Sequence, residues 1–157
     1  MQRLFLPLMQ FCLAAWAAIA VFFFVVVVDL RMSKHFGDET KLNHPKVLFP
    51  RYYQFEAGLL APAFVCACAG FWNAKIGRAR RIALLLLVST TVALAAWDYG
   101  LIYQKLAPML EIPPPLPPEF HALHRMSRWL NEGMLTACAA AAVLALIPER
   151  ATPTESS

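Results

Sequence analysis

The sequence predicts an all-α protein whose helices form a four-helix transmembrane bundle. Of its 157 residues, 59% are hydrophobic and only 15% are charged. A soluble domain of this size needs more polar surface, so the surplus apolar side chains are expected to face lipid. Crossing the hydrocarbon takes about 20 apolar residues in a helix, and the chain has room for four such helices. We therefore expect one membrane domain, residues 1–148, with a disordered polar tail, residues 149–157, and no separate soluble domain.

The first predicted span, residues 4–28, is an uninterrupted apolar run that follows a short basic start. Pro7 lies in its first turn, where a missing N–H costs no helical hydrogen bond. A cleaved signal peptide has a shorter apolar core that is followed by a polar segment. Here the apolar run continues through Val28, so the segment is interpreted as a membrane span.

The first predicted connector, residues 29–51, carries mixed charges and contains two turn signals, at residues 37–38 and 43–45. Such a pattern is typical of a solvated loop, with room for a short surface helix. The second predicted span, residues 52–72, has aromatic residues at both ends, as expected where a helix meets the membrane interface.

A short basic link, residues 73–81, precedes the third predicted span, residues 82–103. The second predicted connector, residues 104–118, contains the run IPPPLPP, whose prolines favour extended polyproline II structure. The last element is expected to be one long helix. It begins with an amphipathic start, residues 119–128, and continues as the fourth span, residues 129–147.

The basic link also predicts the orientation of the chain. With four spans, both termini and the link lie on one face of the membrane. The link holds Lys75, Arg78, Arg80 and Arg81, and the bias of cations toward the cytoplasm is strongest in short loops. We therefore expect cytoplasmic termini in a membrane of the bacterial inner (plasma) type. Cations beside a span are more typical of a topology signal or a lipid contact than of a nucleic-acid site, so no nucleic-acid partner is expected.

Polar residues of the predicted spans gather toward the opposite side of the membrane. Asp98 comes about 25 Å of helix rise after Arg81, and Glu56 lies one turn into the second span. An acid inside a span is costly and usually faces a partner in the bundle interior. The sequence therefore predicts a one-sided polar cluster, with the members Glu56, Asp98, His124, Ser127, Arg128 and Asn131.

Three interpretations of this cluster are open. It can be structural, in a non-enzymatic accessory membrane protein, or it can be the proton or ion path of a small transporter. In the third, His121 and His124 ligate a haem or a metal in a redox protein. Because no second histidine is expected across from His124, no cofactor is predicted. No phosphate-binding loop, nucleophile elbow or His-Glu-x-x-His pair occurs in the sequence, so no enzymatic activity is predicted either. The structural interpretation is the leading one.

Small residues recur at every fourth position of the fourth span, at Gly133, Ala137, Ala141 and Ala145. Such a ridge allows close helix contact, either within the chain or between two copies of it. The lipid bilayer is the expected partner in either case, and a homo-oligomer or another membrane partner is the alternative use of the ridge.

Two motifs mark the start of the second span and the start of the last helix. The first is Leu48-Phe49-Pro50-Arg51-Tyr52-Tyr53, and the second is Phe120-His121-Ala122-Leu123-His124-Arg125-Met126-Ser127 followed by Asn131. They resemble the Leu-Phe-Pro-x-Tyr-Phe and Phe-x-x-Leu-His-x-x-Ser motifs of the transmembrane protein 205-like family, small four-span proteins grouped under a domain of unknown function. The resemblance implies family-type roles for Phe49, Pro50, Tyr52, Phe120, Leu123, His124, Ser127 and Asn131. It implies architecture and membrane location rather than an activity.

Overall fold

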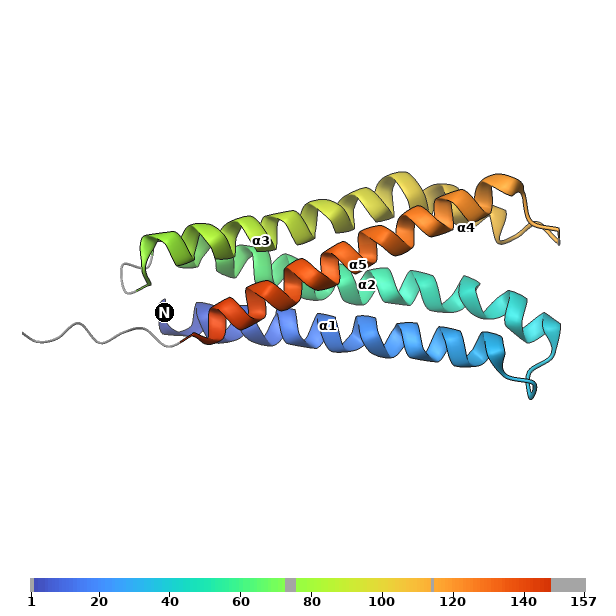
Figure 1. Cartoon of the computed structure of the whole chain (residues 1–157), viewed down its shortest axis with the longest axis horizontal. Coiled ribbons are helices and arrows are strands. Elements are labelled where there is room, and N and C mark those ends of the chain that lie inside the picture. The colour runs from blue at the N-terminus through green and yellow to red at the C-terminus, as the bar shows by residue number, and fades with distance from the viewer. Residues whose placement is uncertain (1, 73–75, 114, 148–157) are drawn as a thin grey trace, which may run out of the picture.

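Four long helices and two short helical segments make up the computed structural model, which describes residues 2–72, 76–113 and 115–147. The elements are α1 (Gln2–Met32), α2 (Asp38–Gly70), α3 (Arg78–Trp97), the π-helical η1 (Asp98–Tyr103), α4 (Gln104–Met109) and α5 (Pro118–Leu146). No strand occurs in these ranges. The long helices run side by side as a bundle (Figure 1), in which α1 and α3 each pack against both α2 and α5. The all-α prediction is confirmed.

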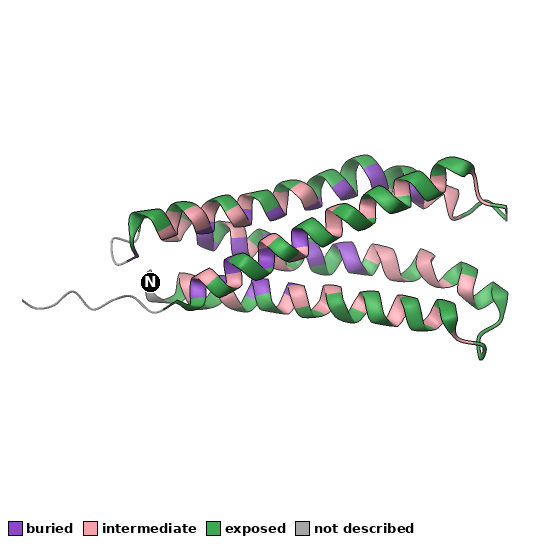
Figure 2. Ribbon diagram, viewed as in Figure 1, coloured by how far each residue is buried: buried purple, intermediate pink, exposed green. Residues whose placement is uncertain are grey.

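Among the described residues, three helical segments are long and apolar enough to cross a membrane: Leu4–Met32, Arg78–Met109 and Pro118–Leu146. α2 is not among them. The outer surface of the bundle is largely exposed in Figure 2, and on α1 it carries bare apolar rings such as Phe11 and Phe22. A soluble monomer rarely exposes apolar patches of this extent, so these faces are suited to lipid. The predicted membrane location is supported by these three segments.

The first connector is much shorter than predicted. α1 continues to Met32 and α2 begins at Asp38, so residues 33–37 alone join them. The expectation of a connector over residues 29–51 is therefore wrong. Asp38 and Glu39 occupy the first turn of α2, where acidic side chains interact favourably with the positive end of the helix dipole.

Packing explains why this charged segment is helical although it contains two prolines, Pro45 and Pro50. A proline inside a helix removes one hydrogen bond and is locally unfavourable. Phe49 lies between these two prolines in the sequence, and its ring centroid is 5.6 Å from that of Phe23 in α1. Contact with α1 thus offsets a local preference for a loop, which is the usual way in which tertiary structure overrides propensity.

The third span and its connector also differ from the predicted bounds. α3 begins at Arg78 rather than at residue 82, and residues 104–109 are helical, so the predicted connector over 104–118 shortens to residues 110–117. Pro117 has φ −56° and ψ 145°, the extended conformation expected of polyproline II. Pro118 is the first residue of α5, where its fixed φ suits a helix start.

α5 is one long helix, as predicted for residues 119–147, and its described end is Leu146. The predicted tail, residues 149–157, and residues 73–75 of the basic link lie outside the described residues.

Cations of the basic link satisfy backbone carbonyls at this end of the bundle. Arg80 donates to the Ala145 carbonyl at 2.8 Å, and the Gln10 amide donates to the same oxygen at 2.7 Å. Arg81 donates to the Phe71 carbonyl at 2.8 Å. The last carbonyls of a helix have no partner within the helix, so these contacts cap the ends of α5 and α2. They also place the start of α1, the start of α3 and the end of α5 together.

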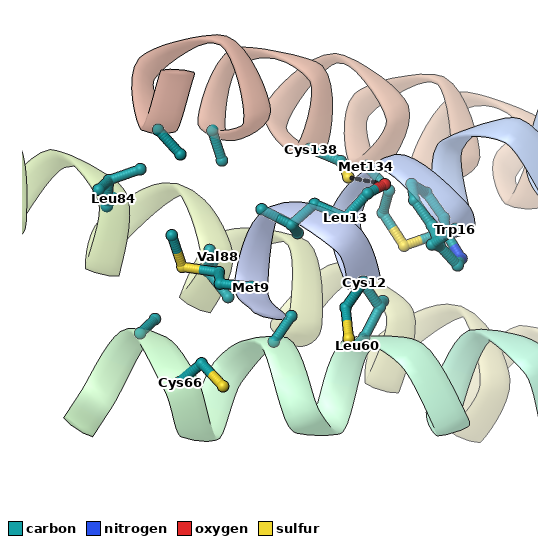
Figure 3. Packing of buried hydrophobic residues seen from close by; sticks show 14 of the residues in the cluster. Met9, Cys12, Leu13, Trp16, Leu60, Cys66, Leu84, Val88, Met134 and Cys138 are labelled. Atoms are coloured by element: carbon teal, nitrogen blue, oxygen red, sulfur yellow. Dashed lines mark hydrogen bonds between the residues drawn. The ribbon is translucent and has the colours of Figure 1, made fainter. Parts of the chain in front are cut away.

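The apolar core lies in the half of the bundle nearest to the α2–α3 link, and Figure 3 shows how its side chains pack against one another. Trp16 and Leu13 are its largest fully buried side chains, and the Cys138 thiol donates to the Leu13 carbonyl at 3.2 Å. All four helices contribute to it. Its members are Met9, Cys12, Leu13, Trp16, Leu60, Ala63, Cys66, Ala67, Leu84, Val88, Ala95, Met134, Cys138, Ala141 and Ala145.

The small-residue ridge of α5 is only partly inside this core. Ala141 and Ala145 are buried, Ala137 is half-buried and Gly133 is exposed. A Cβ atom at Gly133 would lie 3.6 Å from Leu94 Cδ1 of α3. The ridge therefore serves packing within the chain along this stretch, while a homo-oligomer through its exposed part remains a prediction.

Candidate functional site

Polar side chains lie next to the apolar core, on the side away from the α2–α3 link. Directly before its core residues, α2 presents Tyr52, Tyr53 and Glu56, and α5 presents Asn131. Asp98 is the first residue of η1, directly after the core part of α3. Because α2 and α5 each enter the core from this side while α3 leaves it here, the five residues occupy one level of the bundle. We call them the polar cluster.

Asn131 is the centre of the hydrogen bonds in the polar cluster. Its Nδ2 donates to Asp98 Oδ2 at 2.8 Å and to the Ser127 carbonyl at 3.0 Å. Its Oδ1 accepts a hydrogen bond of 2.6 Å from the Tyr52 hydroxyl. Asp98 Oδ2 also accepts a hydrogen bond of 3.0 Å from the Tyr53 hydroxyl. One amide and one carboxyl group therefore connect α2, η1 and α5.

The two acids of the polar cluster are deeply buried. Asp98 is 0% exposed and Glu56 is 3% exposed. Among the described residues, Asp98 Oδ1, Glu56 Oε1 and the indole nitrogen of Trp16 are buried without a hydrogen-bond partner. Burying two carboxyl groups in one site is unfavourable when both carry a charge.

No cation balances these acids within the part of the chain that the structure describes, where the ion pairs are Lys46 with Glu111 and Arg128 with Glu132. The predicted contribution of Arg128 to the cluster is therefore not found. Arg128 is exposed, with Nε 3.8 Å from Glu132 Oε1. Its position on the helix explains this. Arg128 stands three residues before Asn131, so its side chain points about 60° away from that of Asn131 around the helix axis.

His124 also lies outside the hydrogen bonds of the polar cluster. Its side chain is exposed, and its ring stacks on that of Phe120 with centroids 5.8 Å apart and planes at 12°. It lies two turns before Asn131, so it stands one level further from the core. Ser127, one of the predicted members, contributes its backbone carbonyl, which accepts a hydrogen bond from Asn131 Nδ2.

Tyrosine rings surround the exposed side of the polar cluster. The Tyr53 ring centroid lies 4.4 Å from that of Tyr103 and 5.3 Å from that of Tyr99, both in η1. The Tyr52 centroid lies 4.6 Å from that of Phe23 in α1. Asp98, Tyr99 and Tyr103 all belong to the π-helical segment η1, and π-helical turns are often found at functional sites.

The sequence analysis does not include Tyr52 or Tyr53 in the predicted cluster, because both are interpreted there as aromatic residues at the membrane interface. A usable signal was the helical spacing, since Tyr52 and Tyr53 precede Glu56 by four and three residues and share its face. The π-helical turn of η1 has no comparable signal in the sequence.

A cleft of about 490 Å³ opens beyond the polar cluster, at the end of the bundle that holds the α1–α2 loop. Its walls are the last turns of α1, the first turns of α2, the segment before α5 and the first turns of α5. Three histidines line it, and one of them, His44, comes from α2. A histidine of another helix therefore lines the same cleft as His124. No group of three His, Cys, Asp or Glu side chains suited to a metal ion occurs among the described residues.

Comparison of the chain with protein-family models, with curated proteins and with solved structures found no match. The two motifs of the sequence nevertheless meet in the fold, because Tyr52 belongs to the first and Asn131 to the second. The resemblance to the transmembrane protein 205-like family rests on these motifs alone.

Proposed function

We propose that the chain is a multi-pass protein with four spans, in which residues 52–70 of α2 cross the bilayer beside the three more apolar helices. This part of α2 has a helix rise of about 28 Å, close to the thickness of the hydrocarbon, about 30 Å. It packs between α1 and α3, so its polar groups Tyr52, Tyr53 and Glu56 are buried in the bundle and not in lipid. Cytoplasmic termini in a bacterial inner membrane remain the favoured orientation.

The proposed role is that of a non-enzymatic accessory component whose polar cluster fixes the arrangement of the helices. One observation supports this most strongly: the Asn131 amide uses both N–H donors and its oxygen, and its partners come from α2, η1 and α5 itself. A group with all its hydrogen bonds made inside the bundle favours one arrangement over others. The apolar core beyond the cluster argues against a continuous path for ions in this conformation.

The test is to replace Asp98 by Asn, which keeps the shape and the acceptor but removes the charge. In a structural cluster the variant stays folded, with a changed thermal stability in detergent. In reconstituted liposomes the wild-type protein and the variant should both leave a pH gradient unchanged. A proton flux that the wild-type protein carries and the equally stable Asp98→Asn variant lacks would contradict the structural role.

A second candidate, a small proton- or ion-coupled transporter, is favoured by the unpartnered oxygens. Asp98 Oδ1 and Glu56 Oε1 are both buried and have no hydrogen-bond partner among the described residues. A carboxyl group placed in a membrane bundle without a cation is a functional group by default, since an amide would give the same hydrogen bonds at lower cost. The flux measurement with Glu56→Gln beside Asp98→Asn separates the two candidates.

A further inference from the structure

We propose that the cleft at the α1–α2 loop end is a binding site for one anionic phospholipid, whose phosphate lies beside Arg31 and Lys41. The proposal rests on the proposed membrane location but not on the role of the polar cluster. The cleft takes the headgroup and the first part of one acyl chain.

The charges around the cleft are suited to an anion. Lys46 is paired with Glu111 at 3.0 Å, so the two offset each other. Arg31 and Lys41 also line the cleft and have no acidic partner within 4.0 Å among the described residues; the remaining acid there is Glu39. The imidazoles of His44, His121 and His124 add hydrogen-bond donors at the same level. Basic pockets between helices at the headgroup level are typical sites for anionic lipid headgroups.

The apolar part of the cleft is suited to an acyl chain. Val27 and Leu30 of α1, Phe49 of α2 and Phe120 of α5 line it. From this wall an exposed apolar stripe continues along α1 toward the centre of the bundle. The stripe consists of Val28, Phe24 and Val21, which are spaced at three and four residues and are 40%, 60% and 50% exposed. A chain that leaves the cleft therefore has a continuous apolar surface to follow.

The position along the helices is that of the headgroups. The apolar run of α1 ends at Val28, and Asp29 and Arg31 follow. Arginine and lysine at this level extend toward phosphate groups while their apolar stems stay beside the chains. A lipid is therefore a more suitable occupant of this site than a water-soluble anion, because a water-soluble anion makes no favourable contact with the apolar wall.

Native mass spectrometry of the full-length protein in a neutral detergent tests the proposal. Phosphatidylglycerol and phosphatidylcholine with identical acyl chains are added together, and the ratio of the bound species is measured. The wild-type protein should retain one phosphatidylglycerol in preference to phosphatidylcholine. The double variant Arg31→Gln/Lys41→Gln should lose about fivefold of this preference per cation removed, or on the order of 25-fold in all.

The matched control is Lys34→Gln/Arg125→Gln. It removes two exposed cations from the same end of the bundle, from positions that do not line the cleft, and it should keep the preference. Equal losses in both double variants would mean that general surface charge attracts the lipid, and an absence of any preference in the wild-type protein would also overturn the proposal.

Two further measurements separate the remaining outcomes. Leu30→Trp fills the apolar wall and should lower lipid retention, whereas Leu101→Trp, at an exposed position outside the cleft, should not. A Soret band in protein purified from haem-supplied cells would assign the cleft to a porphyrin and overturn the lipid. Asn131→Ala should leave the lipid preference unchanged, so a failed polar cluster and a failed lipid site are distinguishable.

Discussion

The side-chain amide of Asn131 in α5 donates to Asp98 Oδ2 in η1 at 2.8 Å, and both residues lie where the apolar core ends. The carboxyl group is fully buried, and Tyr53 of α2 donates to the same oxygen. A fourth helix, α1, reaches this level through Phe23, whose ring centroid lies 4.6 Å from that of Tyr52. The helices of the bundle therefore meet at polar groups as well as at apolar ones.

Replacing Asn131 by Ala should lower the free energy of unfolding by about 2 kcal/mol, because hydrogen bonds between membrane helices average about 0.6 kcal/mol each and the buried Tyr52 hydroxyl also loses its partner. Unfolding in mixed micelles with increasing sodium dodecyl sulfate measures the change. Thr136→Ala is the control, since its hydroxyl donates within α5 to the Glu132 carbonyl on the exposed face. Equal effects of the two replacements would contradict the role given to Asn131.

Tyr53→Phe should cost about 1 kcal/mol of stability, the typical net value of one hydrogen bond. The replacement removes the hydroxyl that donates to Asp98 and keeps the ring that packs on Tyr103. Tyr103→Phe is the matched control, because the Tyr103 ring packs on that of Tyr53 and its hydroxyl makes no side-chain hydrogen bond among the described residues. The thermal midpoint of unfolding in detergent should fall for Tyr53→Phe and should be unchanged for Tyr103→Phe.

Leu84→Ala should lower stability by about 2–4 kcal/mol through loss of buried contacts and the cavity that remains. Leu84 is 4% exposed in the core, whereas Leu86, two residues along α3, is 62% exposed on the outer face. Leu86→Ala is therefore expected to change stability by less than about 1 kcal/mol. Similar losses at both positions would show that α3 is rotated about its axis relative to the described packing.

The four-span arrangement predicts the sides on which loop residues are labelled. In a background without the four native cysteines, Gly37→Cys and Glu111→Cys should react with a membrane-impermeant maleimide from the same side, since both lie at the α1–α2 loop end of the bundle. Gly77→Cys should react from the opposite side only. Labelling of Gly37→Cys and Gly77→Cys from the same side, with Glu111→Cys on the other, would exclude a spanning α2.

The sequence was informative where a pattern has one physical reading. The apolar runs predicted α1, α3 and α5, and the position of Asp98 and Asn131 near one interface predicted that they lie at one level. The helical start of α2 was not predictable from the same rules, because Pro45 and Pro50 argue locally for a loop and only contact with Phe23 favours a helix. A local signal of that kind gives no information about a partner on another helix.

The partners of the buried acids were predicted less well than their position. Charge alone favours Arg128 and His124 as partners of Asp98. In the structure, the neutral donors Tyr53 and Asn131 point toward Asp98 and form its hydrogen bonds. Tyr53 lies on α2 and Asn131 on α5, so their directions toward Asp98 depend on how these helices pack against η1, and the periodicity of a single helix does not give them. The cleft brings His44 near two histidines of α5 for the same reason, since it depends on how α2 and α5 pack.

A double-mutant cycle between Asn131 and Asp98 tests the central claim most directly. The unfolding free energies of the wild-type protein, Asn131→Ala, Asp98→Ala and the double variant are measured under one set of conditions. If the amide and the carboxyl group connect α5 to η1, the two replacements should be coupled by about 1 kcal/mol. Effects that add to within about 0.3 kcal/mol would contradict a direct connection and, with it, the structural role of the polar cluster.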